Sequence, residues 1–158
     1  MSRLLVLVLA LTALVASSCG GGGGNKPLSK SEYEAQIGAI LRPLQEKTLR
    51  DAILASPADP KRAVSRLKAA ETALHDDADK LAKMNPPADA ADATSRIAQA
   101  LGKIADRVTA IRKDAENGNF AMLEQFKVQI STDPSVRDIR DAIIQLVNLG
   151  YDVAGPGP

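Results

Sequence analysis

The spacing of apolar residues between positions 90 and 115 constrains the fold more than any other feature of this sequence. Side chains that are mostly apolar recur there every three or four residues, at Ala90, Thr94, Ile97, Leu101, Ile104, Val108, Ile111 and Ala115. This spacing places them on one face of a helix and does not fit the two-residue alternation of a half-buried strand. Small residues that would allow a neighbouring backbone to approach run beside this face, at Ala91, Ala98, Gly102 and Ala105. The sequence therefore predicts a long helix that packs against other helices.

The first helix is predicted to begin near Ser29 and to kink at Pro43. Ser29 and Glu32 have the spacing of a capping box, in which two side chains satisfy backbone N–H groups that the helix leaves unpaired. Apolar residues then recur at helical spacing as far as Leu44. Pro43 lies inside this stretch, and its ring clashes with the carbonyl group four residues earlier. We therefore expect a bend at this proline.

Prolines also mark the limits of the other helices. Asp59 is a favourable N-cap for a helix that starts at Pro60, and the next break comes at Pro86. The last apolar-periodic segment, residues 120–150, is interrupted at Pro134. Because the connections are short, successive helices should lie antiparallel. The sequence therefore predicts an all-α fold, an up-and-down four-helix bundle with a kinked first helix and a broken fourth helix.

Leu49 and Ile53 do not fit the main apolar face of the first helix. At about 100° per residue, they lie roughly 160–200° from the line of Tyr33. Either the predicted bend turns both residues into the core, or they form an exposed apolar patch that a partner could cover. We expect burial against the segment that resumes at Val136. Exposure beside other apolar side chains would instead make this pair a possible interaction patch.

Residues 1–18 have the layout of a secretory signal peptide. Arg3 supplies a positive charge, and an apolar stretch over residues 4–16 follows it. This stretch is too short to cross a bilayer, which takes about 20 apolar residues in a helix. Small residues at positions 16–18 then lead directly to Cys19, and this junction resembles a bacterial lipobox. We therefore expect export and cleavage before Cys19.

Cys19 is predicted to carry a diacylglyceryl lipid that holds the protein on the extracytoplasmic face of the cell membrane, with palmitate as a suitable metabolic label. The alternative is ordinary signal-peptide cleavage that leaves Cys19 as a free thiol. We favour lipidation, because an exposed lone thiol is a liability in an oxidising compartment. Residues 19–28 would then form a glycine-rich tether with a reach of about 15–18 Å.

Composition argues against two kinds of binding. The chain has 20 Lys and Arg against 19 Asp and Glu, and Arg3 is the only charged residue of the predicted signal peptide, so the mature protein is neutral. A neutral chain with interspersed charges lacks the basic surface that nucleic-acid binding requires. With two Tyr, two Phe and no Trp, platforms that stack sugars are not expected either.

His75 and Asp79 form the most prominent cluster of metal-ligating side chains. They lie four residues apart on one helical face and could supply two metal ligands, although His75 is the only histidine. The alternative is a solvated face on which Asp76 pairs with Lys80 and Asp79 pairs with Lys83. We favour the solvated face, because runs of charge usually face water.

Glu71 interrupts the apolar face of the second helix. A buried carboxylate there could have a raised pKa and mark a site. We favour the alternative that Glu71 lies at the edge of that face and pairs with Arg107 or Lys103. The sequence contains no nucleophile–base motif and no complete metal motif. We therefore expect neither an enzyme nor a bound cofactor.

Three short motifs flank the predicted helices: Leu28–Tyr33 opens the domain, Leu81–Pro87 precedes the long helix, and Leu149–Tyr151 closes the domain. In these motifs, and over most of residues 28–151, the chain resembles a loose group of small secreted or lipid-anchored helical-bundle proteins of actinobacteria. The resemblance implies a helical bundle and an extracytoplasmic location. The group has no assigned activity, so the resemblance supplies no site residues.

Together these patterns divide the chain into a signal peptide (1–18), a lipidated tether (19–28), a helical bundle (29–151) and a disordered tail (152–158). We expect a membrane-anchored envelope lipoprotein that acts as a non-enzymatic binding module for an unknown envelope protein or wall partner and does not bind nucleic acid. The alternative function is a carrier that holds an apolar small molecule or lipid between its helices.

Overall fold

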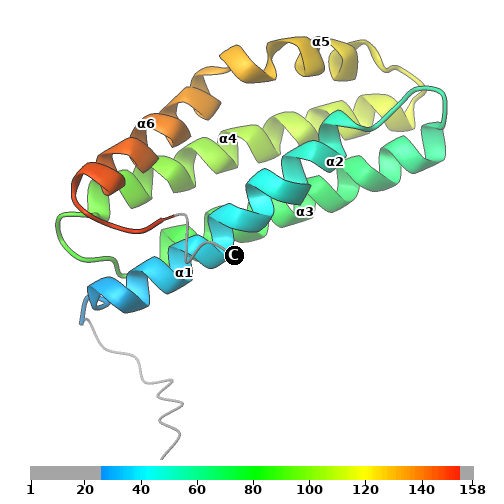
Figure 1. The fold of residues 1–158 in the computed structure, drawn as a ribbon. Helices are drawn as coiled ribbons and strands as arrows, with labels where there is room; N and C mark the ends of the chain where they lie inside the picture. The colour runs from blue at the N-terminus through cyan, green and yellow to red at the C-terminus, as the bar shows by residue number, and fades with distance from the viewer. Residues whose placement is uncertain (1–25, 154–158) are drawn as a thin grey trace, which may run out of the picture.

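The computed structural model describes residues 26–153, apart from the side chains of residues 45 and 51. All regular elements in this part of the chain are helices and it contains no strand, so the predicted all-α class is confirmed (Figure 1). Its elements are α1 (Lys30–Pro43), a π-helical turn η1 (Leu44–Thr48), α2 (Leu49–Ile53), α3 (Pro60–Lys83), α4 (Ala91–Glu116), α5 (Ala121–Gln129), a 3-10 turn η2 (Ile130–Thr132) and α6 (Pro134–Asn148). The predicted signal peptide, Cys19 and residues 154–158 lie outside the described residues.

The predicted helix starts are confirmed by the capping contacts. The side chain of Ser29 accepts a hydrogen bond from the backbone N–H of Glu32, and the Glu32 carboxylate accepts one from the backbone N–H of Ser29 at 2.8 Å. Asp59 accepts a hydrogen bond from the backbone N–H of Arg62 at 3.1 Å, and Pro60 is the first residue of α3. Each cap satisfies a donor that the first helical turn leaves unpaired.

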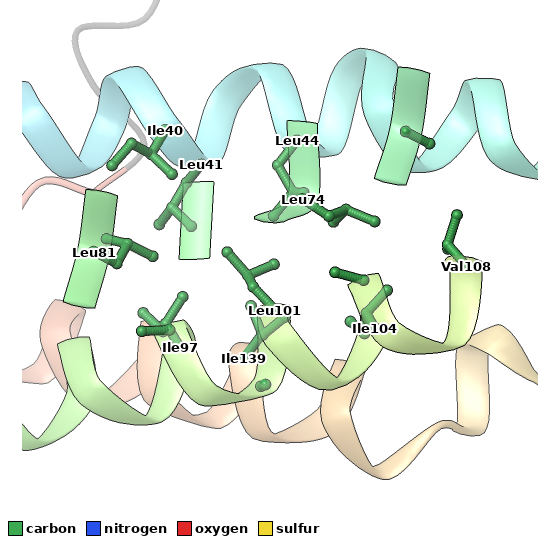
Figure 2. Packing of buried hydrophobic residues seen from close by; sticks show 14 of the residues in the cluster. Ile40, Leu41, Leu44, Leu74, Leu81, Ile97, Leu101, Ile104, Val108 and Ile139 are labelled. Atoms are coloured by element: carbon green, nitrogen blue, oxygen red, sulfur yellow. The ribbon is translucent and has the colours of Figure 1, made fainter. Parts of the chain in front are cut away.

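α4 lies at the centre of the bundle. Its predicted apolar face is buried at Ile97, Leu101, Ile104, Val108 and Ile111. α3 packs against one side of α4, and α6 packs against another (Figure 1). Figure 2 shows side chains of α1 and α3, among them Leu41 and Leu74, directed toward Leu101. The core is therefore built mainly from aliphatic side chains of α1, α3, α4 and α6.

A π-helical turn follows Pro43 and changes which residues of the first helical segment face the core. Hydrogen bonds in such a turn reach back five residues, so it accommodates one extra residue and turns the following helix back by about 100°. Leu49 thereby moves from about 160° to about 60° from the line of Tyr33, and Ala52 moves from about 100° onto that line. Ala52 is accordingly fully buried, and Leu49 and Ile53 are half-buried.

The element that covers Leu49 and Ile53 differs from the expected one. η1 and α2 pack against α3, whereas α6, which follows the break at Pro134, packs against α4. The expected burial against the segment from Val136 is therefore not observed. The physical reason is that the long central helices place α2 and α6 against different helices (Figure 1).

A short strap, residues 149–153, follows α6 and returns across the end of the bundle (Figure 1). The chain turns back at Gly150, whose φ of 82° lies in the left-handed region that strains residues with a side chain. The backbone N–H of Tyr151 then donates to the carbonyl of Leu146 at 3.0 Å. Tyr151 and Val153 are both buried, so packed structure extends two residues beyond the predicted boundary at 151.

Candidate functional site

The two tyrosines of the chain meet at the end of the bundle where α1 begins. The ring of Tyr151 lies edge-on to the ring of Tyr33, with centroids 5.1 Å apart. The phenol of Tyr151 donates to Asp89 at 2.7 Å, and the ammonium group of Lys30 lies 5.4 Å from the centre of the Tyr151 ring. These contacts tie the start of α1, the α3–α4 connection and the strap together.

Both phenols act as structural hydrogen-bond donors. The oxygens of Tyr33 and Thr94 are 2.8 Å apart, and the Thr94 hydroxyl donates its proton to the carbonyl of Ala90 at 2.8 Å, so Tyr33 is the donor. Burial raises the pKa of Tyr33. Burial, reinforced by the nearby Asp89 carboxylate, raises the pKa of Tyr151 to about 12. Neither phenol is therefore poised for acid–base chemistry near neutral pH.

The same end of the bundle carries exposed apolar side chains. Ile144 and Val147, three residues apart on α6, are 50% and 54% exposed, and we call them the α6 apolar pair. Leu149, at the end of that helix, is 43% exposed. Arg137 and Arg140 lie one to two turns earlier on the same outward face. Large apolar side chains that stay accessible together indicate an interaction surface.

A cleft of about 420 Å³ lies between α4, α5 and the turn that precedes α6. Its lining mixes apolar and polar side chains: Arg107, Ile111, Met122, Gln125, Phe126, Gln129, Thr132, Asp133 and Pro134. Arg107 forms an ion pair with the buried carboxylate of Asp133, which also accepts a hydrogen bond from the backbone N–H of Ser135 at 2.8 Å. The mixed lining suits an amphipathic molecule. In the sequence, Asp133 and Pro134 indicated a helix break and nothing more.

Glu71 lies at the α3–α4 contact and pairs with Arg112. The guanidinium group of Arg112 bonds to Glu71 and also to Glu116 at 2.6 Å. The hydrogen bond from Arg112 lowers the pKa of Glu71. Glu71 therefore does pair with a basic residue of α4, but that residue is Arg112, and the expected partners, Arg107 and Lys103, are wrong. Arg107 is instead held by Asp133 on another side of α4.

The face that carries His75 and Asp79 is exposed to solvent. Asp79 pairs with Lys83 at 3.3 Å, as expected. Lys80 pairs with Asp77 at 3.0 Å and not with the expected Asp76, since residues three and four positions apart are both neighbours on a helix. Within residues 26–153, no three His, Cys, Asp or Glu side chains come close enough to hold a metal ion.

Leu49 and Ile53, for which an interaction patch was the alternative to burial, belong to α2, which lies near the opposite end of the bundle from the start of α1 (Figure 1). Both are half-buried, and the next residue, Leu54, is 50% exposed. The backbone carbonyl of Leu54 accepts a hydrogen bond from Arg66 at 2.8 Å, which fixes the end of α2 on α3. We call Leu49, Ile53 and Leu54 the α2 patch.

No family model, curated protein or solved structure matches this chain. No helix in the described residues combines the length and the apolar character that crossing a bilayer requires. The apolar side chains that remain accessible at each end of the bundle, among them Leu54 and Val147, are the features of the domain that point to an interaction.

Proposed function

We propose that this protein is a lipid-anchored protein of the cell envelope, held on the extracytoplasmic face of the membrane by a lipid on Cys19, and that its helical domain is a non-enzymatic binding module. The partner would be an envelope protein or a wall component. The first helix begins only at Lys30. The glycine-rich residues 19–28 therefore precede the helical domain, where a tether is needed.

The observation that carries the binding role is the α2 patch, in which Leu54 is 50% exposed beside the half-buried Leu49 and Ile53. α3 has 24 residues and is therefore about 36 Å long, and Leu54 is fixed to Arg66, its seventh residue, so the α2 patch lies roughly 25–35 Å from the end at which α1 begins. A domain anchored near residue 26 would hold the α2 patch away from the bilayer, where a partner can reach it. Arg62 and Arg66 lie beside Leu54, so a partner with apolar and acidic side chains would fit best.

We also propose the up-and-down connectivity predicted from the sequence, with residues 30–53, α3, α4 and residues 121–148 as the four successive legs. The short connections at 54–59, 84–90 and 117–120 support it, because connections of this length join antiparallel neighbours. This arrangement agrees with the resemblance to lipid-anchored helical-bundle proteins.

The lipid anchor is tested by metabolic palmitate labelling and fractionation of the wild-type protein and Cys19→Ala. Wild-type protein should be labelled and sediment with membranes, whereas Cys19→Ala should be unlabelled, soluble and still helical by circular dichroism. An unlabelled, soluble wild-type protein would refute the anchor.

Binding by the α2 patch is tested in the native host with a photo-crosslinking amino acid at Leu54 and, as a control, at Ser65. Both positions are exposed, but Ser65 lies on the polar surface of α3. One defined crosslinked product should form from position 54 and not from position 65. Identical product patterns from both positions would contradict a specific patch.

A second candidate function is supported by the cleft beneath α5. Ile111, Met122 and Phe126 could contact the apolar part of a carried molecule, and Arg107 could contact its polar end. Native mass spectrometry of the purified protein distinguishes the two functions. A bound lipid that is lost in Met122→Trp, which should fill the cleft, would favour a carrier. A clean unliganded mass would favour the binding module.

A further inference from the structure

We infer that the α6 apolar pair, Ile144 and Val147, rests on the lipid bilayer, so that the domain lies on the membrane in one fixed orientation. This inference rests on the proposed anchor at Cys19. It assigns the two accessible apolar surfaces to different ligands: the α6 apolar pair would contact lipid, and the α2 patch at the other end would contact the partner.

The α6 apolar pair lies close to the start of α1. The ring of Tyr151 lies 5.1 Å from that of Tyr33 and 5.4 Å from the ammonium group of Lys30, the first residue of α1. Val147 precedes Tyr151 by only four residues. The end of α6 and the start of α1 therefore lie at the same end of the bundle (Figure 1).

The chain between Cys19 and that end of the bundle is short. About nine residues of tether have a reach of about 15–18 Å, and full extension gives roughly 30 Å. The lipid on Cys19 would therefore hold the start of α1, and the α6 apolar pair beside it, within a few ångströms to a few tens of ångströms of the headgroups. At such an effective concentration, a weak surface contact becomes well populated.

The outward face of α6 is apolar near the end of the helix. Two branched aliphatic side chains can insert among headgroups and acyl chains, and Leu149 extends the apolar surface at the helix end. Arg137 and Arg140 lie further along the same helix, away from the end that would meet the bilayer, and Arg140 is paired with Asp141 at 3.5 Å. Apolar contact, and not net charge, would therefore provide most of the attraction.

A protein partner fits the α6 apolar pair less well. Such a partner would have to compete with the bilayer, which the lipid on Cys19 holds beside this end of the domain at all times. The α2 patch, roughly 25–35 Å away along α3, has no such competitor.

The test uses the full-length lipidated protein in vesicles of phosphatidylethanolamine and phosphatidylglycerol. Cys19 is the only cysteine and its thiol is blocked by the lipid, so Val147→Cys can be labelled with an environment-sensitive fluorophore. Val128→Cys is the matched control, because Val128 is also an exposed helical valine, 80% exposed on α5. We expect emission at position 147 to shift to the blue and to be quenched severalfold more by spin-labelled lipids than emission at position 128.

Equal quenching at the two positions would overturn the inference. A blue shift at position 147 that appears without vesicles and grows with protein concentration would also overturn it, because a second copy of the chain would then cover the pair. Vesicle flotation separates this failure from failure of the anchor: protein that floats while position 147 stays in water refutes only the bilayer contact, and wild-type protein that does not float refutes both.

A second measurement avoids the fluorophore. In vesicle-bound wild-type protein, amide hydrogen exchange across residues 140–148 should be slower than in the unanchored Cys19→Ala variant in solution. Ile144→Ser combined with Val147→Ser should lose this protection while still floating with vesicles. Protection that persists in the double variant would contradict a bilayer contact through these side chains.

Discussion

The phenol of Tyr151 donates a 2.7 Å hydrogen bond to the carboxylate of Asp89, although 62 residues separate them in the sequence. The backbone N–H of the next residue, Asp152, donates to the side chain of Glu34 at 2.9 Å. The strap therefore connects α6 to the α3–α4 connection and to α1. It closes the end of the bundle that we propose faces the membrane.

Tyr151→Phe should destabilise the domain by about 1 kcal/mol, because it removes one hydrogen bond to a charged but solvent-accessible acceptor and leaves the ring packing in place. Urea denaturation of the two proteins measures the difference. Tyr151→Ala, which also removes a buried ring, should cost about 3–5 kcal/mol. Equal losses in the two variants would mean that the buried ring contributes nothing beyond the hydrogen bond.

The stability of the domain should fall as the pH rises from about 10 toward about 12. Tyr151 has a folded-state pKa of about 12, whereas an unfolded tyrosine ionises near pH 10. The contribution of Tyr151 to the free energy of unfolding is therefore complete below about pH 10. It is lost as the pH rises through the folded-state pKa, because between about pH 10 and pH 12 only the unfolded chain releases the proton readily. The difference in the free energy of unfolding between wild type and Tyr151→Phe, measured by denaturation at each pH, should shrink over this range. An advantage that is constant from pH 9 to 12 would contradict the raised pKa.

Replacing Asp133 with Ala should lower the stability of the domain more than replacing it with Asn. Asp133→Ala removes both the N-cap of α6 and the ion pair with Arg107, and should cost about 2–4 kcal/mol. Asp133→Asn keeps an oxygen that can accept from Ser135, so it should cost only about 1 kcal/mol. Thermal and urea denaturation measure both values. Equal losses would mean that the cap contributes nothing beyond the ion pair.

α4 should be the most sensitive helix to truncation of core side chains. Leu101 is fully buried, so Leu101→Ala should cost about 2–5 kcal/mol. Lys113 is exposed on the same helix, so Lys113→Ala should change the denaturation midpoint little. Equal midpoints for the two variants would refute the central position of α4.

The π-helical turn predicts which alanine tolerates a larger side chain. Ala52 is fully buried, so Ala52→Leu should overpack the core and cost about 1–3 kcal/mol. Ala69→Leu places the same extra volume on the exposed surface of α3 and should have little effect. If instead Ala52→Leu left the urea midpoint unchanged, Ala52 would not face the core, as expected if residues 30–53 formed one uninterrupted α-helix without the π-helical turn.

Local patterns in the sequence were enough to predict the helices and the main core face. The capping box at Ser29 and Glu32 and the Asp59 cap before Pro60 are contacts between residues within three positions of each other, so local spacing is enough to predict them. The burial of Leu101 and its neighbours on α4 follows from helical periodicity in the same way.

Which helices meet, and how the side chains between them pair, became clear from the folded structure alone. The π-helical turn after Pro43 shifts the phase of the helix, so periodicity counted from Tyr33 misplaces Leu49 and Ala52. Arg107 and Arg112 are equally basic in the sequence, and the rotation of α4 decides that Asp133 binds the first and Glu71 the second. Contacts between distant residues depend on helix rotation and offset, which the packing of the whole core fixes and no local pattern specifies.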